Sequence, residues 1–414
     1  MSVVLNVASR CSRAGAQALQ LAADARDTCQ AGALLLRGSP SAVGWFAGWL
    51  STEFPPHVVT GHALCRVSPP SIARVATAWA AQRADQALTA GLEECFGPDF
   101  RELVRQPAYA QSECTPRAGL LRMPGPHRRY AAETSNIPYG PGGSAHLLDI
   151  WRRHDLAPGY RAPVLIQVPG GAWTLNRKRG QAYTLMSRMV ELGWICVSIN
   201  YSKSPRCAFP AHLIDVKRAI AWVRENIADY GGDPDFIAIT GGSAGGHLAS
   251  LAALTPNDPA FQPGFEDADT TVEAAALYYG VYDFTDLENM NDIMLPFLEH
   301  FVLKARYADE PERFRAASPI SYVHRDAPPF FVLHGEKDEL VPSGQGRAFC
   351  AALREAGATV GYAELANAHH AFDITPTVRS KLAADAVADF LGVVYGRRGG
   401  SLRAVLPLSA SSAS

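Results

Sequence analysis

The feature that most constrains this chain is a glycine-rich turn between a β-branched run and a helical pattern. The run is 236–240, the turn is 241–246 (Gly-Gly-Ser-Ala-Gly-Gly), and the helical pattern covers 244–254. A serine on so sharp a turn needs neighbours without side chains two residues to either side, because turn and helix crowd those positions. The pattern predicts a nucleophile elbow that exposes the hydroxyl of Ser243. A phosphate-binding loop is the alternative, but the G-x-G-x-x-G spacing and the P-loop lysine are missing.

The elbow lies in a region where short β-branched runs alternate with helical patterns, from about residue 125 onward. This alternation predicts an α/β fold, a doubly wound and mostly parallel sheet with helices on both faces. The predicted strands are 146–151, 163–168, 194–200, 236–240, 274–279, 329–333 and 360–365, and the predicted helices are 179–192, 211–230, 244–254, 344–356 and 378–394.

The N-terminal part of the chain has a different composition, rich in Ala, Leu, Arg and Gln, and carries no motif for chemistry. Helical periodicity over 14–36 and 71–96 predicts a helical region that caps the site. We therefore expect three parts. These are a helical accessory region over 1–125, a catalytic domain over 126–395 and a disordered Ser/Ala-rich tail over 396–414.

A nucleophilic serine needs a base, and the base needs an acid to orient it. The predicted strand 329–333 leads into a loop that carries Asp338, with Glu336 and Glu339 as rival carboxylates. The strand 360–365 is followed by two histidines, His369 and His370. Both loops leave the carboxyl ends of parallel strands, the edge at which the elbow lies. The order Ser, acid, His is the one that an elbow on such a sheet requires.

Hydrolysis also needs hydrogen-bond donors for the negative oxygen of the tetrahedral intermediate. The strand 163–168 ends in 169–173 (Pro-Gly-Gly-Ala-Trp), again on the catalytic edge. We expect backbone N–H groups of this loop, together with that of Ala244, to form an oxyanion hole. The alternative is that Gly170 and Gly171 make only a tight turn.

The segment from about 145 to 395 resembles the hormone-sensitive-lipase-like branch of the α/β-hydrolase esterases, which includes the bacterial carboxylesterases. Beyond the elbow, the matching stretches are 201–205 (Tyr-Ser-Lys-Ser-Pro), 209–211 (Phe-Pro-Ala), 231–234 (Gly-Gly-Asp-Pro), 334–338 (His-Gly-Glu-Lys-Asp) and 370–372 (His-Ala-Phe). The family's histidine loop places the catalytic histidine just before a small residue and Phe. The resemblance therefore implies His370 as the base rather than His369, and Asp338 as the acid.

The oxyanion loop departs from the family pattern at two positions. The family motif usually begins with His followed by glycines, whereas Pro169 stands in the His position here and Ala172 replaces the third Gly. The resemblance implies the N–H groups of Gly171 and Ala172 as donors. These backbone groups survive the change, but the loop loses the support of the histidine side chain.

The resemblance implies a serine carboxylic-ester hydrolase that works through an acyl-enzyme, with no metal and no organic cofactor. Its partner is a small-molecule ester, and we expect short to medium acyl chains. One alternative is another acyl-transfer enzyme, such as a peptidase, lipase or transferase, although a peptidase of this fold usually carries a large separate domain. The other is a catalytically degenerate binding protein of the same fold, which only Pro169 favours.

Several other residues receive packing roles. We expect His247, one helical turn after Ser243, to be buried, His334 to be structural, and Asp215 to brace the loop near Tyr201. Trp173 and the apolar residues of 281–327 either line an acyl pocket or belong to core or lid packing, and their spacing favours packing.

Composition sets the remaining expectations. A net charge of −2 without a concentrated basic face predicts no nucleic-acid partner. The eight cysteines have no metal-like spacing and predict free thiols in a reducing compartment, hence a cytoplasmic protein. Disulfides before residue 115 are the alternative. The first residues do not read as a signal peptide, and no apolar run is long enough for a membrane span. Surface attachment by the N-terminal helices is an open alternative, and no pattern indicates an oligomeric state.

Overall fold

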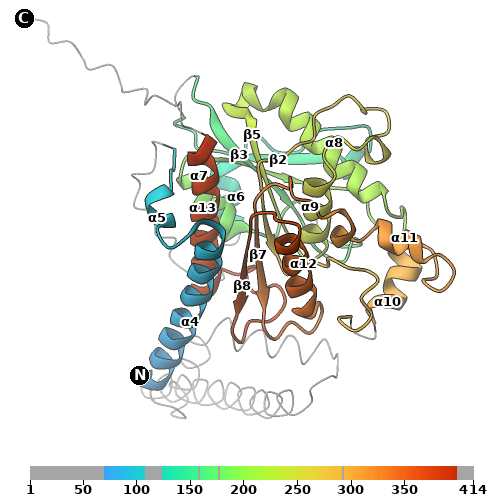
Figure 1. The fold of residues 1–414 in the computed structure, drawn as a ribbon. Coiled ribbons are helices and arrows are strands. Elements are labelled where there is room, and N and C mark those ends of the chain that lie inside the picture. The colour runs from blue at the N-terminus through green and yellow to red at the C-terminus, as the bar shows by residue number, and fades with distance from the viewer. Residues whose placement is uncertain (1–69, 108–123, 157–158, 176–177, 291–292, 399–414) are drawn as a thin grey trace, which may run out of the picture.

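A computed structural model describes residues 70–107, 124–156, 159–175, 178–290 and 293–398 (Figure 1). The β-branched runs form one eight-stranded sheet in the order β1-β2-β4-β3-β5-β6-β7-β8. The pairs β1–β2 and β2–β4 are antiparallel, and all the other pairs are parallel. The strands are β1 (Ile137–Pro138), β2 (Leu147–Trp151), β3 (Ala162–Val168), β4 (Ile195–Ile199), β5 (Gly232–Gly242), β6 (Ala274–Tyr278), β7 (Phe330–Gly335) and β8 (Val360–Leu365). The predicted mostly parallel sheet is confirmed.

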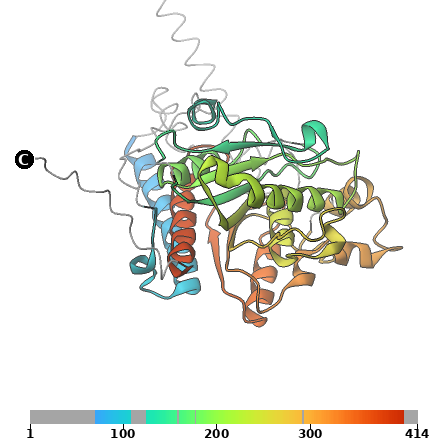
Figure 2. The ribbon, with the colours of Figure 1, turned by 90° about the horizontal axis from the view of Figure 1, so that it is seen from above.

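Helices cover both faces of this sheet, as Figure 2 shows from above. The longer helices are α4 (Pro70–Phe96), α7 (Tyr183–Glu191), α8 (Ala211–Asn226), α9 (Ala244–Leu254), α12 (Gly344–Glu355) and α13 (Val378–Arg398). The shorter α-helices are α5 (Phe100–Leu103), α6 (Pro124–Tyr130), α10 (Met294–Phe297) and α11 (Pro311–Ala316). Short 3₁₀ turns lie at Gly143–Ala145, Ile227–Tyr230, Pro259–Phe261 and Pro319–Tyr322, and Leu298–Leu303 is a π-helix.

The sheet separates two apolar cores, and the alternation of side chains along β3 shows the division. Every residue of β3 is buried, as expected for a central parallel strand covered on both faces. Val164 and Ile166 pack on one side with α8, α9 and α12, whereas Leu165 packs on the other with α7, α13 and α4. Two residues later on this second face stands Gln167, a polar side chain close to the catalytic edge.

The predicted helix over 71–96 is confirmed as α4, which lies beside α13 (Figures 1 and 2). Ala84, Leu88 and Leu92 are the buried face of its apolar stripe, packed in the same core as Phe331 of β7. The predicted helix over 14–36 lies outside the described residues, so the cap and the division at residue 125 stay predictions. No helix among the residues described is long and apolar enough to cross a membrane.

The chain departs from its sequence pattern just before α7. The periodicity predicted a helix from residue 179, but α7 begins at Tyr183. Gly180 and Ala182 adopt left-handed conformations, with φ of 118° and 55°, which no α-helix accommodates. Near the C-terminus, α13 continues to Arg398, beyond the predicted domain end at 395.

Candidate active site

The predicted elbow joins β5 to α9, and Ser243 sits between them. Its backbone has φ 57° and ψ −124°, a sparsely populated conformation for a residue with a side chain. The Ser243 N–H donates to the carbonyl of Tyr278 at 2.9 Å, which ties the turn to β6. The side chain is partly exposed, as a nucleophile requires.

Close backbone approach explains the glycines around Ser243. A Cβ added at Gly241 would lie 2.4 Å from the carbonyl oxygen of Gly245, and one at Gly245 would lie 2.1 Å from that of Val168. Carbon and oxygen atoms do not approach so closely without a bond. The G-x-S-x-G pattern is therefore a steric requirement of this turn and of its packing on the end of β3.

The loops after β7 and β8 bring one carboxylate and one histidine together. The Nδ1 of His370 lies 2.7 Å from Oδ2 of Asp338. Oδ1 of Asp338 accepts the N–H groups of Leu340 and Val341 at 3.0 and 2.8 Å. Because the carboxylate accepts from Nδ1–H, Nε2 of His370 is left as the proton acceptor.

The electrostatics keep this carboxylate charged. Burial of Asp338 opposes ionisation, but the charge of His370 and hydrogen bonds from His334 and His370 outweigh it and hold the pKa of the carboxyl below its usual range. His334 Nε2 lies 3.3 Å from Oδ2 of Asp338 and 2.8 Å from the carbonyl oxygen of Val341. It braces the acid loop, as its predicted structural role requires.

The alternative carboxylates, Glu336 and Glu339, and the alternative base, His369, make other contacts. Glu336 accepts the N–H of Asn367 at 2.8 Å and so links the acid loop to the histidine loop. Glu339 is 4.0 Å from Nδ1 of His369. Burial, followed by the charge of Lys337, lowers the pKa of His369 to about 4. The structure therefore pairs Asp338 with His370, the two residues that the family resemblance implies.

The loop at 169–173 lies directly against the elbow. A Cβ on Gly170 would be 2.4 Å from the carbonyl oxygen of Gly242 and 3.2 Å from Cβ of Ser243. Gly171, Ala172 and Trp173 all have positive φ, of 109°, 51° and 56°. Positive φ is uncommon for residues with a side chain, so Ala172 and Trp173 hold this loop in a sparsely populated conformation.

The backbone N–H groups of this loop differ in whether they already donate to an acceptor within the protein. The Gly170 N–H donates to Oε1 of Gln181 at 2.7 Å. Within the described parts of the chain, no acceptor is recorded for the N–H groups of Gly171 and Ala172. The N–H of Ala244 stands in the first turn of α9 and has no acceptor within the helix. These three are the donors expected from the sequence.

One contact of a catalytic triad is not formed. Among the residues described, Ser243 Oγ and His370 make no recorded hydrogen bond to each other. Tyr279 nevertheless lies close to both residues. Its ring centroid is 4.6 Å from that of His370, and a Cβ added to Gly242, the residue before Ser243, would lie 2.9 Å from the ring. In unliganded sites such hydrogen bonds often tighten only with substrate.

His247, Trp173 and Asp215 pack as expected, whereas Leu287 and Phe301 of the 281–327 segment are exposed. His247 is fully buried, accepts the Trp173 Nε1–H at 3.2 Å and lies 2.7 Å from the carbonyl oxygen of Ala317 through Nε2. Burial lowers the pKa of His247 to about 3, so the ring is neutral. Trp173 packs edge-on against His247 and Phe284 and belongs to the core. Asp215 accepts the Ser202 N–H at 2.8 Å and so braces the loop after β4.

Sequence reasoning missed the pair Tyr279 and Asp373. The hydroxyl of Tyr279 donates to the Asp373 carboxylate beside His370. Burial raises the pKa of Asp373. The only signal in the sequence was the position of Tyr279, one residue beyond the carboxyl end of β6.

The chain is similar to known esterases in sequence and in fold. The family model BD-FAE matches residues 148–353. Esterase LipQ of Mycobacterium tuberculosis is 73% identical over 99% of this chain and 100% of its own length. The probable carboxylic ester hydrolase LipM of the same organism is 50% identical over 87% of this chain and 89% of its own. A solved structure, a truncated carbohydrate esterase from gut microbiota, is 26% identical with a TM-score of 0.55, covering 64% of this chain and 97% of that one.

These similarities extend well beyond single motifs. Two relatives named as ester hydrolases each match more than four-fifths of the chain. The sheet order and the elbow agree with the resemblance seen in the sequence. The chain is a carboxylesterase and belongs to the hormone-sensitive-lipase-like branch of the α/β-hydrolase family.

Proposed function

We propose that this carboxylesterase works by two-step acyl transfer, with Ser243 as nucleophile, His370 as base and Asp338 as the acid that orients it. The observation that carries the proposal is the 2.7 Å contact between His370 Nδ1 and a buried, charged Asp338, on the same sheet edge as the strained Ser243. A carboxylate so placed fixes the tautomer of the histidine and stabilises the imidazolium that forms.

The steps follow from these positions. Nε2 of His370 takes the Ser243 Oγ proton while Oγ attacks the carbonyl carbon of the ester. The oxyanion accepts hydrogen bonds from the N–H groups of Gly171, Ala172 and Ala244. The intermediate collapses to the acyl-enzyme, and the alcohol leaves with the proton from His370. Water then attacks the acyl-enzyme and gives a proton to His370, which passes it to Ser243 Oγ as the acid is released and the free enzyme is restored.

We propose short- to medium-chain esters as substrates. Aromatic side chains support this, because they fill the space beside the oxyanion loop and the first turns of α9. The His247 and Phe284 rings stack at 4.7 Å, and Trp173 and Phe209 contact His247 from two sides. This side of the elbow is packed as core, where a long acyl chain would need an open channel.

A chain-length series of nitrophenyl esters tests the proposed substrates with the full-length protein. Rates should peak at short acyl chains and fall as the chain lengthens. A clear optimum at long chains, with a jump in rate above the solubility limit of the substrate, would contradict the proposal and indicate an interfacial lipase. A protein that hydrolyses none of the esters and ignores a fluorophosphonate probe would instead be a degenerate member of the fold.

A further inference from the structure

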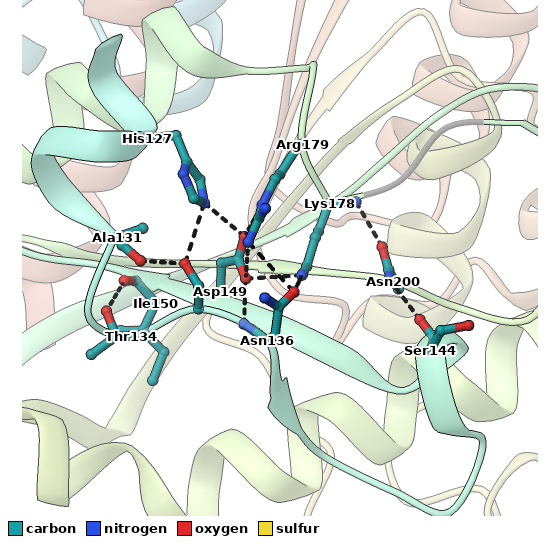
Figure 3. Close-up of polar contacts among 11 residues, drawn as sticks. His127, Ala131, Thr134, Asn136, Ser144, Asp149, Ile150, Lys178, Arg179 and Asn200 are labelled. Carbon is teal, nitrogen blue, oxygen red and sulfur yellow. Dashed lines mark hydrogen bonds and ion pairs between the residues drawn. The ribbon is translucent and has the colours of Figure 1, made fainter. Parts of the chain in front are cut away.

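The segment that follows the oxyanion loop is fastened to a buried carboxylate on β2. Figure 3 shows His127, Lys178 and Arg179 pointing toward Asp149. Lys178 Nζ lies 2.9 Å from Oδ1, whereas Arg179 Nε and His127 Nε2 lie 2.7 and 2.9 Å from Oδ2. The backbone N–H of Asn136 completes the set at 2.7 Å from Oδ1. The Asp149 side chain is fully buried and receives donors from three parts of the chain.

This carboxylate stays ionised. Burial opposes its charge, but hydrogen bonds from Arg179, Asn136, Lys178 and His127 outweigh burial and lower the pKa of Asp149. The Lys178 side chain is itself only 5% exposed, so its ammonium depends on Asp149 as its counter-ion. Removing one partner of a buried ion pair leaves the other uncompensated, which is far more damaging than losing a surface pair.

The same anchor sets the backbone that carries Gln181. The N–H of Lys178 donates to Oδ1 of Asn200 at 2.8 Å, so the main chain is held as well as the side chain (Figure 3). The left-handed Gly180 and Ala182 then flank Gln181. From this position the Gln181 amide oxygen accepts the Gly170 N–H at 2.7 Å. A continuous set of bonds thus runs from β2 to the oxyanion loop.

We propose that Gln181 and Asp149 are positioning residues for the oxyanion hole. The inference rests on the proposed function, in which Gly171 and Ala172 supply the donors. By holding Gly170, the Gln181 amide fixes the rotation of the next two peptide units toward Ser243. Asp149 acts one step further away, through Lys178 and Arg179. Together they replace the support that a histidine at position 169 gives in related enzymes, where this chain has Pro169.

Two variants test the proposal in the full-length protein. Gln181→Leu removes the acceptor for the Gly170 N–H, and Asp149→Asn removes the charge that holds the segment. Losing one oxyanion donor outright costs about 10²- to 10³-fold in kcat, so misplacing donors should lower kcat by about 10- to 100-fold. KM should stay within about threefold, because the bonds at stake form only in the transition state.

A pair of inhibitors separates positioning from general damage. A trifluoromethyl ketone forms a tetrahedral adduct with an oxyanion, whereas the matching methyl ketone binds mainly as a ground-state analogue. In both variants the trifluoromethyl ketone should lose affinity by the same factor as kcat/KM, while the methyl ketone keeps its affinity. Equal losses for both ketones would overturn the proposal, because they would indicate a deformed site.

Lys217→Met provides the matched control, since it also removes a charge from a buried polar cluster. Lys217 on α8 binds the carbonyl of Thr255, and its Nζ lies 3.1 Å from Gln262 Oε1, away from the oxyanion loop. This variant should lose thermal stability with kcat unchanged. If Asp149→Asn does not fold, Gln181→Leu alone decides. An active wild-type enzyme whose Gln181→Leu variant keeps kcat within about twofold overturns this inference only, whereas failure of the wild type to react at Ser243 overturns the proposed function.

Discussion

The nucleophile elbow and the oxyanion loop touch each other, yet they are held in different ways. The elbow is shaped by contacts of backbone with backbone, because Gly241 and Gly245 leave no room for a Cβ. The oxyanion loop shares one such contact, at Gly170, but it is also held by side chains from elsewhere in the chain. Gln181 holds the Gly170 N–H, and the hydroxyl of Tyr201 donates to the carbonyl of Pro169 at 2.9 Å. Local steric limits therefore explain the glycines of the elbow, whereas distant side chains give the oxyanion loop support that does not depend on the residue at position 169.

The largest effect should come from the elbow itself. Ser243→Ala deletes the nucleophile and should lower kcat by about 10⁴- to 10⁶-fold. The small, apolar replacement keeps the backbone hydrogen bond to Tyr278. Ester hydrolysis and thermal unfolding are the measurements. A folded variant with activity within about tenfold of the wild type would remove Ser243 from the mechanism.

Substitutions of the two adjacent histidines should differ in their effect on kcat almost as strongly. His370→Ala removes the ring that contacts Asp338 and should lower kcat nearly as much as loss of the serine. His369→Ala should keep most of the activity, because Asp338 contacts His370, whereas Nδ1 of His369 lies 4.0 Å from Glu339. Rates of both variants at pH 7 decide the matter. A reversed pattern would mean that the histidine loop uses the other residue.

The oxyanion loop should respond less than the triad but still clearly. Gly171→Pro removes one of the two proposed donors in this loop and imposes a φ of about −65°, against the observed 109°. One lost donor should reduce kcat by about 10²- to 10³-fold, with a smaller change in KM. Steady-state kinetics on a short-chain nitrophenyl ester measure both. An unchanged kcat would show that the oxyanion is bound elsewhere.

The smallest effect should come from restoring the family's residue. Pro169→His changes a side chain whose loop is already held by Gln181 and Tyr201. We expect kcat to change by less than about tenfold, roughly 1.4 kcal/mol in barrier. A gain of about a hundredfold in kcat would mean that Pro169 impairs the oxyanion hole. The oxyanion loop would then be a damaged part of the site, unlike the elbow.

The same contrast explains what the sequence could predict. The strands, the elbow and the loops with Asp338 and His370 are marked by local patterns, namely β-branched runs, glycines at fixed spacing and strand ends. Local periodicity failed before α7, because Arg179 binds Asp149, 30 residues earlier in the chain. The helical spacing of apolar residues contains no information about a hydrogen bond to a strand elsewhere in the chain. The helix therefore begins only at Tyr183, after the residues that distant side chains hold.

Long-range pairs account for the other omissions. Tyr279 and Asp373 are 94 residues apart and meet only because β6 and the histidine loop end at the same edge. Gln181 looked like an ordinary helical residue, since its acceptor role depends on where the Gly170 N–H points. The cap and the helix over 14–36 fall on residues outside those that the structure describes, and they stay predictions.

The central claim is that Ser243 is the nucleophile of this carboxylesterase. The most direct test is to treat the full-length protein with a fluorophosphonate, digest it and locate the adduct by mass spectrometry. The account predicts one adduct, on Ser243, that forms at a much lower rate in the His370→Ala variant. A wild-type protein that hydrolyses esters but carries the adduct on another residue, or none at all, would contradict it.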